Sequence, residues 1–316
     1  MTSSVQNTLH LVPHESSRRT AAARPWLSDN VWRWLMLAPT FAILIGLTLI
    51  PIGQLLVMSL HQISWSGGSA LWRFVAFDNY LALLRDHLFH AGVANTLIFA
   101  VVGVAVQMVL GFALALFTSK ILHARTVYRT VFLLPILVPG IVVGAIWKLM
   151  YNADFGVINS LTGLVGIGPQ DWLGEPSLAL ASVIVVNIWH WTPFCYLLLL
   201  AGIESLPQDV YEAARVDGAS AWQELIHITL PMMLPTIIVT LIFRLVVAFK
   251  VFDEVYLLTG GGPGTATEVV SFSIYRRFFT EDRTGYGSAL SIVTLFIMAL
   301  LIVLAVGAVQ RRRSAA

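Results

Sequence analysis

The stretch VANTLIFAVVGVAVQMVLGFALALF, Val93–Phe117, decides the fold of this chain, because its 25 residues include no charged side chain. An α-helix needs about 20 predominantly apolar residues to cross the hydrocarbon core of a bilayer. The stretch therefore predicts a membrane-spanning helix. Five further runs meet the same test, which gives six predicted spans in all. These are Trp34–Leu60, Val127–Met150, Leu178–Ala201, Met232–Tyr256 and Ala289–Val309.

The composition of the chain excludes an ordinary water-soluble protein. The 316 residues are 57% hydrophobic and 11% charged, whereas soluble domains contain about 25% charged residues. So few charges cannot cover the surface of a soluble domain of this length. The predicted fold class is all-α integral membrane. Prolines inside the first and third runs predict kinked helices, which need packed neighbours to satisfy the freed carbonyls.

The positions of Lys and Arg predict the orientation. Basic residues precede the first run, surround the loop after the second run and close the chain, and such residues mark the cytoplasmic side. Both termini would then be cytoplasmic, as would the loop between the fourth and fifth runs. Three arginines on the opposite side weaken this asymmetry without reversing it. We expect a disordered tail at 1–30, a six-helix membrane domain at 31–310 with a cytoplasmic loop at about 203–231, and a basic tail at 311–316.

The loop sequence EAARVDGASAWQELIHITLP, Glu212–Pro231, predicts two short helices joined by a turn. Gly218 follows an aspartate and can take the left-handed conformation that ends a helix. Ser220 and Gln223 have the spacing of a capping box, and the second helix is expected to be interrupted by Pro231 and Pro235. Helices this short are marginal alone in water. The pair is therefore expected either to pack into another protein or to lie on the membrane surface.

The same loop resembles the EAA signature of bacterial ABC importer permeases: Glu-Ala-Ala, three residues, Gly, nine residues, then Ile-x-Leu-Pro. Further segments are similar to the sugar-permease subfamily, typified by the maltose system: YLLTGGGPGTAT at Tyr256–Thr267, FDNYLALL after the first run, FGVINSL after the third and WHWTPF in the fourth. The resemblance covers about Trp34 to Val309. The positions that it marks for coupling to an ATPase are Glu212, Ala213, Ala214, Asp217, Gly218, Ile228, Leu230 and Pro231.

The resemblance implies a type I ABC importer permease fold with six transmembrane helices and cytoplasmic coupling helices. It implies a second homologous permease subunit, two copies of a cytoplasmic ATPase and an extracytoplasmic solute-binding protein. ATP and Mg would bind to the ATPase, and this chain would bind no cofactor. The membrane would be the cytoplasmic membrane of a bacterium or archaeon. The cargo would be a sugar, an oligosaccharide or a polyol, with glycerol-3-phosphate as the alternative.

The residues themselves argue against catalysis by this chain. Only three lysines occur and none follows a glycine, so no phosphate-binding G-x-x-x-x-G-K-[ST] loop can be written. The glycine-rich run at Gly260–Gly264 lacks the lysine and reads as a flexible loop. The histidines form no H-E-x-x-H pattern, so no catalytic or metal site is predicted. Cys195 is the only cysteine and is expected to be a small buried hydrophobe. Membrane lipid is expected to surround the chain, and no nucleic-acid partner is expected.

Polar and aromatic residues within the fourth and fifth runs are candidates for the transport path, because ionisable groups inside a membrane are functional candidates by default. Two alternatives stay open. The charged residues could pair to hold helices together, as Lys250 and Glu254 could at i, i+4 spacing, or they could relay protons in an ion-coupled secondary transporter. The path candidates are Asn187, Trp189, His190, Trp191, Arg244, Lys250, Asp253 and Glu254.

Overall fold

The computed structural model describes residues 28–120 and 125–314. Most of the predicted N-terminal tail, including three of the arginines used for orientation, lies outside these ranges. Contacts divide the chain into two units, one ending at Ile52 and the other beginning at Gly53. The described part of the first unit belongs to helix α1 (Asp29–Ser59). None of the most apolar 18-residue window of this helix is buried within the described chain, so its side chains are available to lipid or to a partner.

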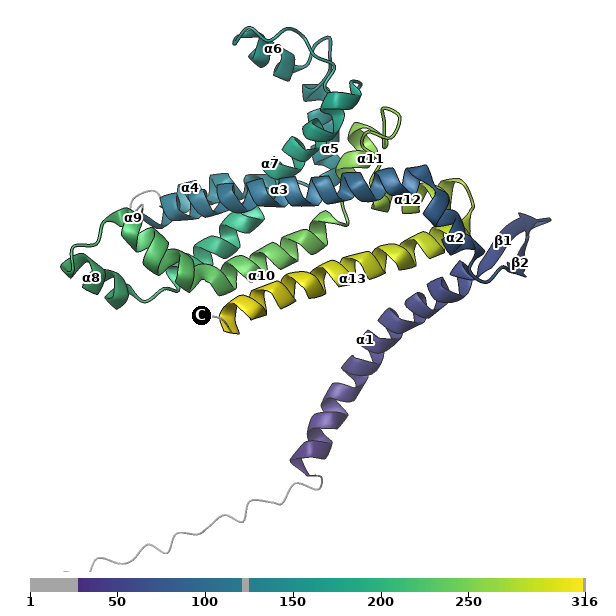
Figure 1. Cartoon of the computed structure of the whole chain (residues 1–316), viewed down its shortest axis with the longest axis horizontal. Coiled ribbons are helices and arrows are strands. Elements are labelled where there is room, and N and C mark those ends of the chain that lie inside the picture. Colours follow the sequence, from purple (N-terminus) through teal and green to yellow (C-terminus); the bar gives the residue numbers. More distant parts are fainter. Residues whose placement is uncertain (1–27, 121–124, 315–316) are drawn as a thin grey trace, which may run out of the picture. The chain divides into compact units, whose positions relative to one another are not determined.

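The second unit is a bundle of long apolar helices, as predicted. The described chain contains five helices long and apolar enough to cross a membrane, or six if one bent pair counts as a single span. Figure 1 shows α3, α10 and α13 side by side, and α7 contacts both α3 and α10. Besides α1, the long helices are α3 (His87–Lys120), α7 (Pro176–Glu204), α10 (Leu230–Ala248) and α13 (Thr284–Ser314).

Helices α3 and α7 approach each other closely at Gly111. A Cβ atom added at Gly111 would lie 2.7 Å from Cys195 Cβ and 2.9 Å from the backbone nitrogen of Tyr196. Small residues allow membrane helices to pack backbone against backbone in this way. Cys195 has no exposed surface, which confirms its predicted role as a small buried hydrophobe.

The third predicted span, Val127–Met150, is not one straight helix. It consists of α4 (Arg125–Leu133), the short 3-10 helix η1 (Leu134–Leu137) and α5 (Gly140–Met150), with a bend of 92° at the break. Val138 has an extended backbone, with φ −84° and ψ 126°. A residue that precedes a proline is pushed towards this conformation, so Pro139 explains where the helix breaks.

The fifth predicted span, Met232–Tyr256, differs from the structure at both ends. It ends early, because α10 stops at Ala248 and a separate helix, α11 (Asp253–Leu258), follows the break. It begins earlier than predicted, because one continuous apolar helix runs from Ala221 to Ala248. The prediction that Pro231 ends a short helix was therefore wrong.

A π-helical turn explains how this helix continues through its prolines. The segment η2 (Glu224–Thr229) lies directly before α10, and Pro231 occupies the first turn of α10. Proline removes a backbone donor and crowds the carbonyl four residues earlier. A π-turn shifts the hydrogen-bond register by one residue, which relieves this conflict. The Thr229 hydroxyl also donates to the Glu224 carbonyl at 3.2 Å.

A β-hairpin lies between α1 and α3 and was not predicted from the sequence. Strands β1 (His61–Ser66) and β2 (Ser69–Phe74) pair antiparallel. Gly67 and Gly68 form the two-residue turn with φ of 57° and 81°, and this left-handed pair suits the twist of a hairpin. The remaining short helices in the loops are α2 (Asp78–Arg85), α6 (Val157–Gly163), α12 (Val270–Tyr275) and the π-helix η3 (Arg276–Thr280).

An ionic cluster joins α13, η3 and the residue before α3. Asp86 accepts a hydrogen bond from the Tyr286 hydroxyl and lies 3.4 Å from Arg277 Nη2. Its Oδ1 also accepts from the Leu88 amide at 2.9 Å. Burial alone would raise the pKa of Asp86, but the hydrogen bonds from Tyr286 and Leu88 and the charge of Arg277 hold this pKa below its usual value.

Candidate functional site

The residues of the EAA signature form a helix–turn–helix, here called the EAA loop (Glu212–Pro231). Helix α8 (Gln208–Val216) begins after Pro207. The chain then reverses at Gly218, whose φ is +82°, and the Gly218 amide donates to the Arg215 carbonyl at 3.1 Å. The left-handed turn predicted at Gly218 is therefore confirmed.

The predicted capping box is also present. The Ser220 side chain accepts from the Gln223 backbone amide, and the Gln223 side chain accepts from the Ser220 amide at 2.8 Å. These two bonds satisfy donors at the start of α9 (Ala221–Gln223) that the helix cannot satisfy itself. The second arm of the EAA loop is thus the beginning of the spanning helix rather than a separate element.

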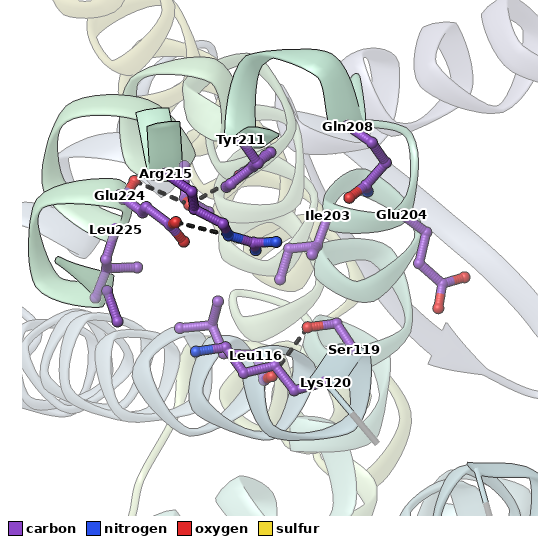
Figure 2. A pocket seen from close by; sticks show the side chains of 12 residues that line it. Leu116, Ser119, Lys120, Ile203, Glu204, Gln208, Tyr211, Arg215, Glu224 and Leu225 are labelled. Carbon is purple, nitrogen blue, oxygen red and sulfur yellow. Dashed lines mark hydrogen bonds and ion pairs between the residues drawn. The ribbon is translucent and has the colours of Figure 1, made fainter. Parts of the chain in front are cut away.

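Two side-chain contacts tie α8 to this second arm. The Tyr211 hydroxyl lies 2.9 Å from Thr229 Oγ1, and Arg215 Nε donates to Glu224 Oε1 at 3.0 Å. The EAA loop stands off from the ends of α3 and α7 and leaves a cavity of about 890 Å³. Figure 2 shows the Arg215–Glu224 pair on one side of this cavity, with Leu116 and other α3 residues on the facing side.

The outer surface of the EAA loop is apolar at its turn. Val216 is 88% exposed and Trp222 is 69% exposed, and they flank the turn from opposite sides. Burial of each would stabilise a complex by about 1.5–3 kcal/mol. Among the residues that the resemblance marks, Ala214, Ile228 and Leu230 are partly buried against the chain. The others, Glu212, Ala213, Asp217, Gly218 and Pro231, are exposed.

Four of the predicted path residues meet inside the bundle. Together with Gln107 they form a buried polar cluster, whose other members are Asn187, His190, Arg244 and Glu254. Arg244 Nε donates to Gln107 Oε1 at 2.8 Å, and Arg244 Nη2 donates to Asn187 Oδ1 at 3.0 Å. Gln107 Nε2 donates to Asn187 Oδ1 at 3.0 Å. Asn187 Nδ2 then donates to Glu254 Oε1 at 3.1 Å. The cluster joins α3, α7, α10 and α11.

His190 links this cluster to the break in the third span. Its Nδ1 lies 3.2 Å from Glu254 Oε1, and its Nε2 lies 3.1 Å from the Val138 carbonyl oxygen. Both ring nitrogens therefore face acceptor oxygens. The extended backbone at Val138, which Pro139 imposes, supplies the free carbonyl.

Arg244 is enclosed within the cluster. Its side chain has no exposed surface, and its guanidinium carbon lies 4.7 Å from the centre of the Trp191 ring. A cation over an indole face is attracted by the ring quadrupole. Its Nη1 is buried without a hydrogen-bond partner among the described residues.

A cavity of about 250 Å³ adjoins the polar cluster between α5, α7, α10 and α11; we call it the path cavity. A Cβ atom at Gly140 would lie 2.7 Å from Asp253 Oδ2, so this carboxylate rests against the first residue of α5. Seven of the eight predicted path residues line the cavity: Asn187, His190, Trp191, Arg244, Lys250, Asp253 and Glu254.

Three findings correct or extend the sequence predictions. Trp189 does not line the path cavity. It is 42% exposed and packs edge-on against Trp147. Successive residues of an α-helix are rotated by about 100°, so Trp189 points to a different side of α7 from Asn187 and His190. Lys250 and Glu254 do not form the helical pair that was one of the two alternatives, since α10 ends before Lys250. Gln107 was missed, although a lone amide in an apolar span is itself a signal of a buried polar contact.

The chain is similar in sequence and in structure to known transport proteins. The family model described as "Binding-protein-dependent transport system inner membrane component" matches residues 107–314. The trehalose/maltose transport system permease protein MalF of Thermococcus litoralis is 37% identical over 84% of this chain and 89% of the relative. The sulfoquinovosyl glycerol transport system permease protein SmoG of Agrobacterium fabrum is 34% identical over 84% and 86%. A chain of a bacterial ABC transporter involved in import of the acidic polysaccharide alginate has a TM-score of 0.77 at 26% identity, over 89% of this chain and 96% of that one.

Proposed function

Since the chain belongs to the family of binding-protein-dependent transport system inner membrane components, we propose that it is the permease subunit of an ATP-driven importer for a sugar, oligosaccharide or polyol. The family match and the apolar spans make it a multi-pass membrane protein. It is a transport subunit rather than an enzyme. Its assembly needs a second permease subunit, an ATPase and a solute-binding protein.

The main support for a role in coupling to the ATPase is the exposed apolar turn of the EAA loop. Val216 and Trp222 project from a turn that the described residues leave uncovered. Hydrogen bonds and the capping box fix the shape of this turn, which therefore suits insertion into a cleft of another protein. We assign the EAA loop to contact with the ATPase, which binds ATP and Mg, so that closure of two ATPase copies moves the spanning helix that begins at Ala221.

The orientation and location follow from this role. The EAA loop and both termini face the cytoplasm, and the membrane is the cytoplasmic membrane of a bacterium or archaeon. We retain the domain boundaries predicted from the sequence: a tail at 1–30, a membrane domain at 31–310 and a basic tail at 311–316.

We assign the path cavity to the half of the translocation route that this subunit forms. Its volume of about 250 Å³ lies below the usual ligand-pocket range of about 300–1,000 Å³. It can therefore enclose only part of a larger sugar, and the second permease would supply the facing half. The names of the relatives support a sugar: trehalose or maltose for one, starch degradation products for another. Glycerol-3-phosphate remains the second candidate cargo for the same importer class.

Co-purification with the ATPase tests the coupling role. The native complex is purified from membranes by a tag on this chain, as wild type and as Trp222→Glu. We expect the charged variant to insert in the membrane but to lose most of the ATPase. Leu164→Glu serves as the control, because Leu164 is also highly exposed, at 83%, but lies in the loop between α5 and α7. Equal ATPase recovery with Trp222→Glu and wild type would contradict the assignment of the EAA loop.

A further inference from the structure

The loop between α5 and α7 has an apolar surface that the coupling and transport roles do not use. From residue 155 to residue 170 the loop contains no charged side chain. We infer that this surface, here called the loop face, inserts into the lipid leaflet on the side of the membrane opposite the EAA loop. Identifying this leaflet as the outer one rests on the proposed function. The side chains of the loop face are 45–83% exposed, and they are Phe155, Val157, Leu161, Leu164, Val165 and Ile167.

The polar side chains of this loop point inward, which is the reverse of a water-exposed loop. Asn159 Nδ2 donates to the Gln170 carbonyl at 2.9 Å, and Asn159 Oδ1 accepts from Trp172 Nε1 at 2.7 Å. A helix at a water-exposed surface turns its polar residues outward and its apolar residues inward. Helix α6 instead leaves Val157 and Leu161 uncovered by the described residues. This arrangement is stable where the surroundings are apolar.

The loop is tied to α7 at the level where the hydrocarbon core of the bilayer ends. The 29 residues of α7 extend about 43 Å at a rise of about 1.5 Å per residue, which matches the thickness of about 40–45 Å of a bilayer with its head groups. The core of about 30 Å therefore begins about 5–8 Å inside the end of α7 at Pro176. Ser182 lies about 9 Å inside that end. Its carbonyl accepts from the Tyr151 hydroxyl at 3.2 Å, and its own hydroxyl donates to the Trp172 carbonyl at 2.9 Å, so both ends of the loop are held at the boundary.

An apolar surface also continues along α5, the helix that leads into the loop. Val142, Ile146 and Leu149 have the i, i+4, i+7 spacing of one helix face and are 42–63% exposed. Near them Trp147 of α5 packs edge-on against Trp189 of α7. Tryptophan is enriched where membrane helices reach the boundary between lipid and water. The loop face therefore extends a surface that already lies in lipid.

Lipid suits the loop face better than a protein partner does. Protein interfaces surround an apolar centre with a polar rim, whereas the loop face has no charged residue along its length. Interfacial segments bind membranes through buried apolar area and through attraction of basic residues to anionic lipids. Only the first contribution is present here, so insertion does not require anionic lipid. The contact holds the far end of α5, whose first residue, Gly140, lines the path cavity.

Site-directed spin labelling tests this insertion in the complete complex in nanodiscs. Cys195 is the only cysteine of the chain and has no exposed surface, and the other subunits are prepared without cysteine. A nitroxide is attached in turn to Leu161→Cys and Leu164→Cys on the loop face. Phe296→Cys is the lipid reference, because Phe296 is 70% exposed on the spanning helix α13. Asp154→Cys is the water reference, because Asp154 is an exposed charged residue of the same loop.

The readout is the ratio of collisions with oxygen, which concentrates in lipid, to collisions with a water-soluble nickel chelate. At Leu161 and Leu164 we expect a ratio close to that at Phe296 and severalfold above that at Asp154. The same ratio is expected in phosphatidylcholine with and without phosphatidylglycerol.

A ratio close to the Asp154 value would overturn the inference, because the loop face would then lie in water. Shielding from both reagents would overturn it as well, since the second permease or the solute-binding protein would then cover the face. A lipid-like ratio that appears only with phosphatidylglycerol would contradict insertion by apolar contact. Recovery of the ATPase in the same preparations tests the proposed function separately. A wild-type chain that purifies without an ATPase would count against that function whatever the labels show.

Discussion

Replacing Gly218 with valine tests the EAA loop at its most constrained residue. Gly218 has a φ of +82°, and a Cβ atom there would meet no other atom within 4 Å. The substitution therefore causes no steric clash, and its whole effect is backbone strain. A left-handed conformation costs an L-residue about 1–2 kcal/mol, and β-branching places valine at about 2 kcal/mol.

The turn has little free energy to offset this strain. Two backbone hydrogen bonds hold it, from Gly218 to the Arg215 carbonyl and from Ala219 to the Ala214 carbonyl. Each contributes about 1 kcal/mol net, so the strain of valine cancels them. An energy of 2 kcal/mol changes the equilibrium between the native turn and its alternatives about 30-fold. We therefore expect coupled ATP hydrolysis to fall severalfold while membrane insertion is retained.

The assay is substrate-stimulated ATP hydrolysis by the purified complex, with Gly218→Asn and Gly218→Ala beside Gly218→Val. Asparagine tolerates the left-handed region better than other non-glycine residues, so activity should decline in the order Gly, Asn, Ala, Val. Unimpaired hydrolysis and sugar uptake in Gly218→Val would refute the coupling role of this turn. Equal loss in all three variants would show that the strain argument is wrong.

Three further predictions concern the bundle. Gly111→Ala should lower the melting temperature in detergent because its Cβ would lie 2.7 Å from Cys195 Cβ, whereas Gly103→Ala on the same helix should be nearly neutral; equal melting temperatures would contradict the close approach of α3 and α7. Gln107→Leu should destabilise the fold by about 2 kcal/mol, since it leaves Arg244 Nε without its buried acceptor, and an unchanged denaturation midpoint would show that the cluster is not stabilising. The pKa of Asp86 is held below its usual value, so its stabilisation is present above about pH 4 and is lost as the pH falls through the native pKa; thermal melts from pH 2 to 6 should show a shallower acid loss for Asp86→Asn than for wild type.

The sequence was sufficient for features that depend on local rules. Apolar length located the spans, apart from the ends of the fifth and the bend in the third, since crossing a bilayer sets a minimum length regardless of the neighbours. The turn at Gly218 and the cap at Ser220 were also predictable, because each depends on residues at most three positions apart. These features are the ones that shape the EAA loop.

Features set by contacts between distant residues were not predictable in the same way. Pro139 breaks its span, whereas Pro231 does not, because a π-turn that hydropathy does not reveal precedes Pro231. The partner of Glu254 proved to be His190, 64 positions earlier, instead of Lys250 at helical spacing. Gln107 escaped notice because its partners lie 80 and 137 positions further along the chain.

Uptake of radiolabelled maltose or trehalose into sealed proteoliposomes separates an ATP-driven importer from an ion-coupled transporter. The vesicles contain the complete complex, with ATP on the side of the EAA loop and the binding protein on the other, and are compared with vesicles that carry a proton gradient and no ATP. We predict uptake that requires ATP and the binding protein and is strongly reduced by Gly218→Val. Uptake by this chain alone on a proton gradient, unaffected by Gly218→Val, would contradict the assignment and place Lys250, Asp253 and Glu254 at the centre of the mechanism.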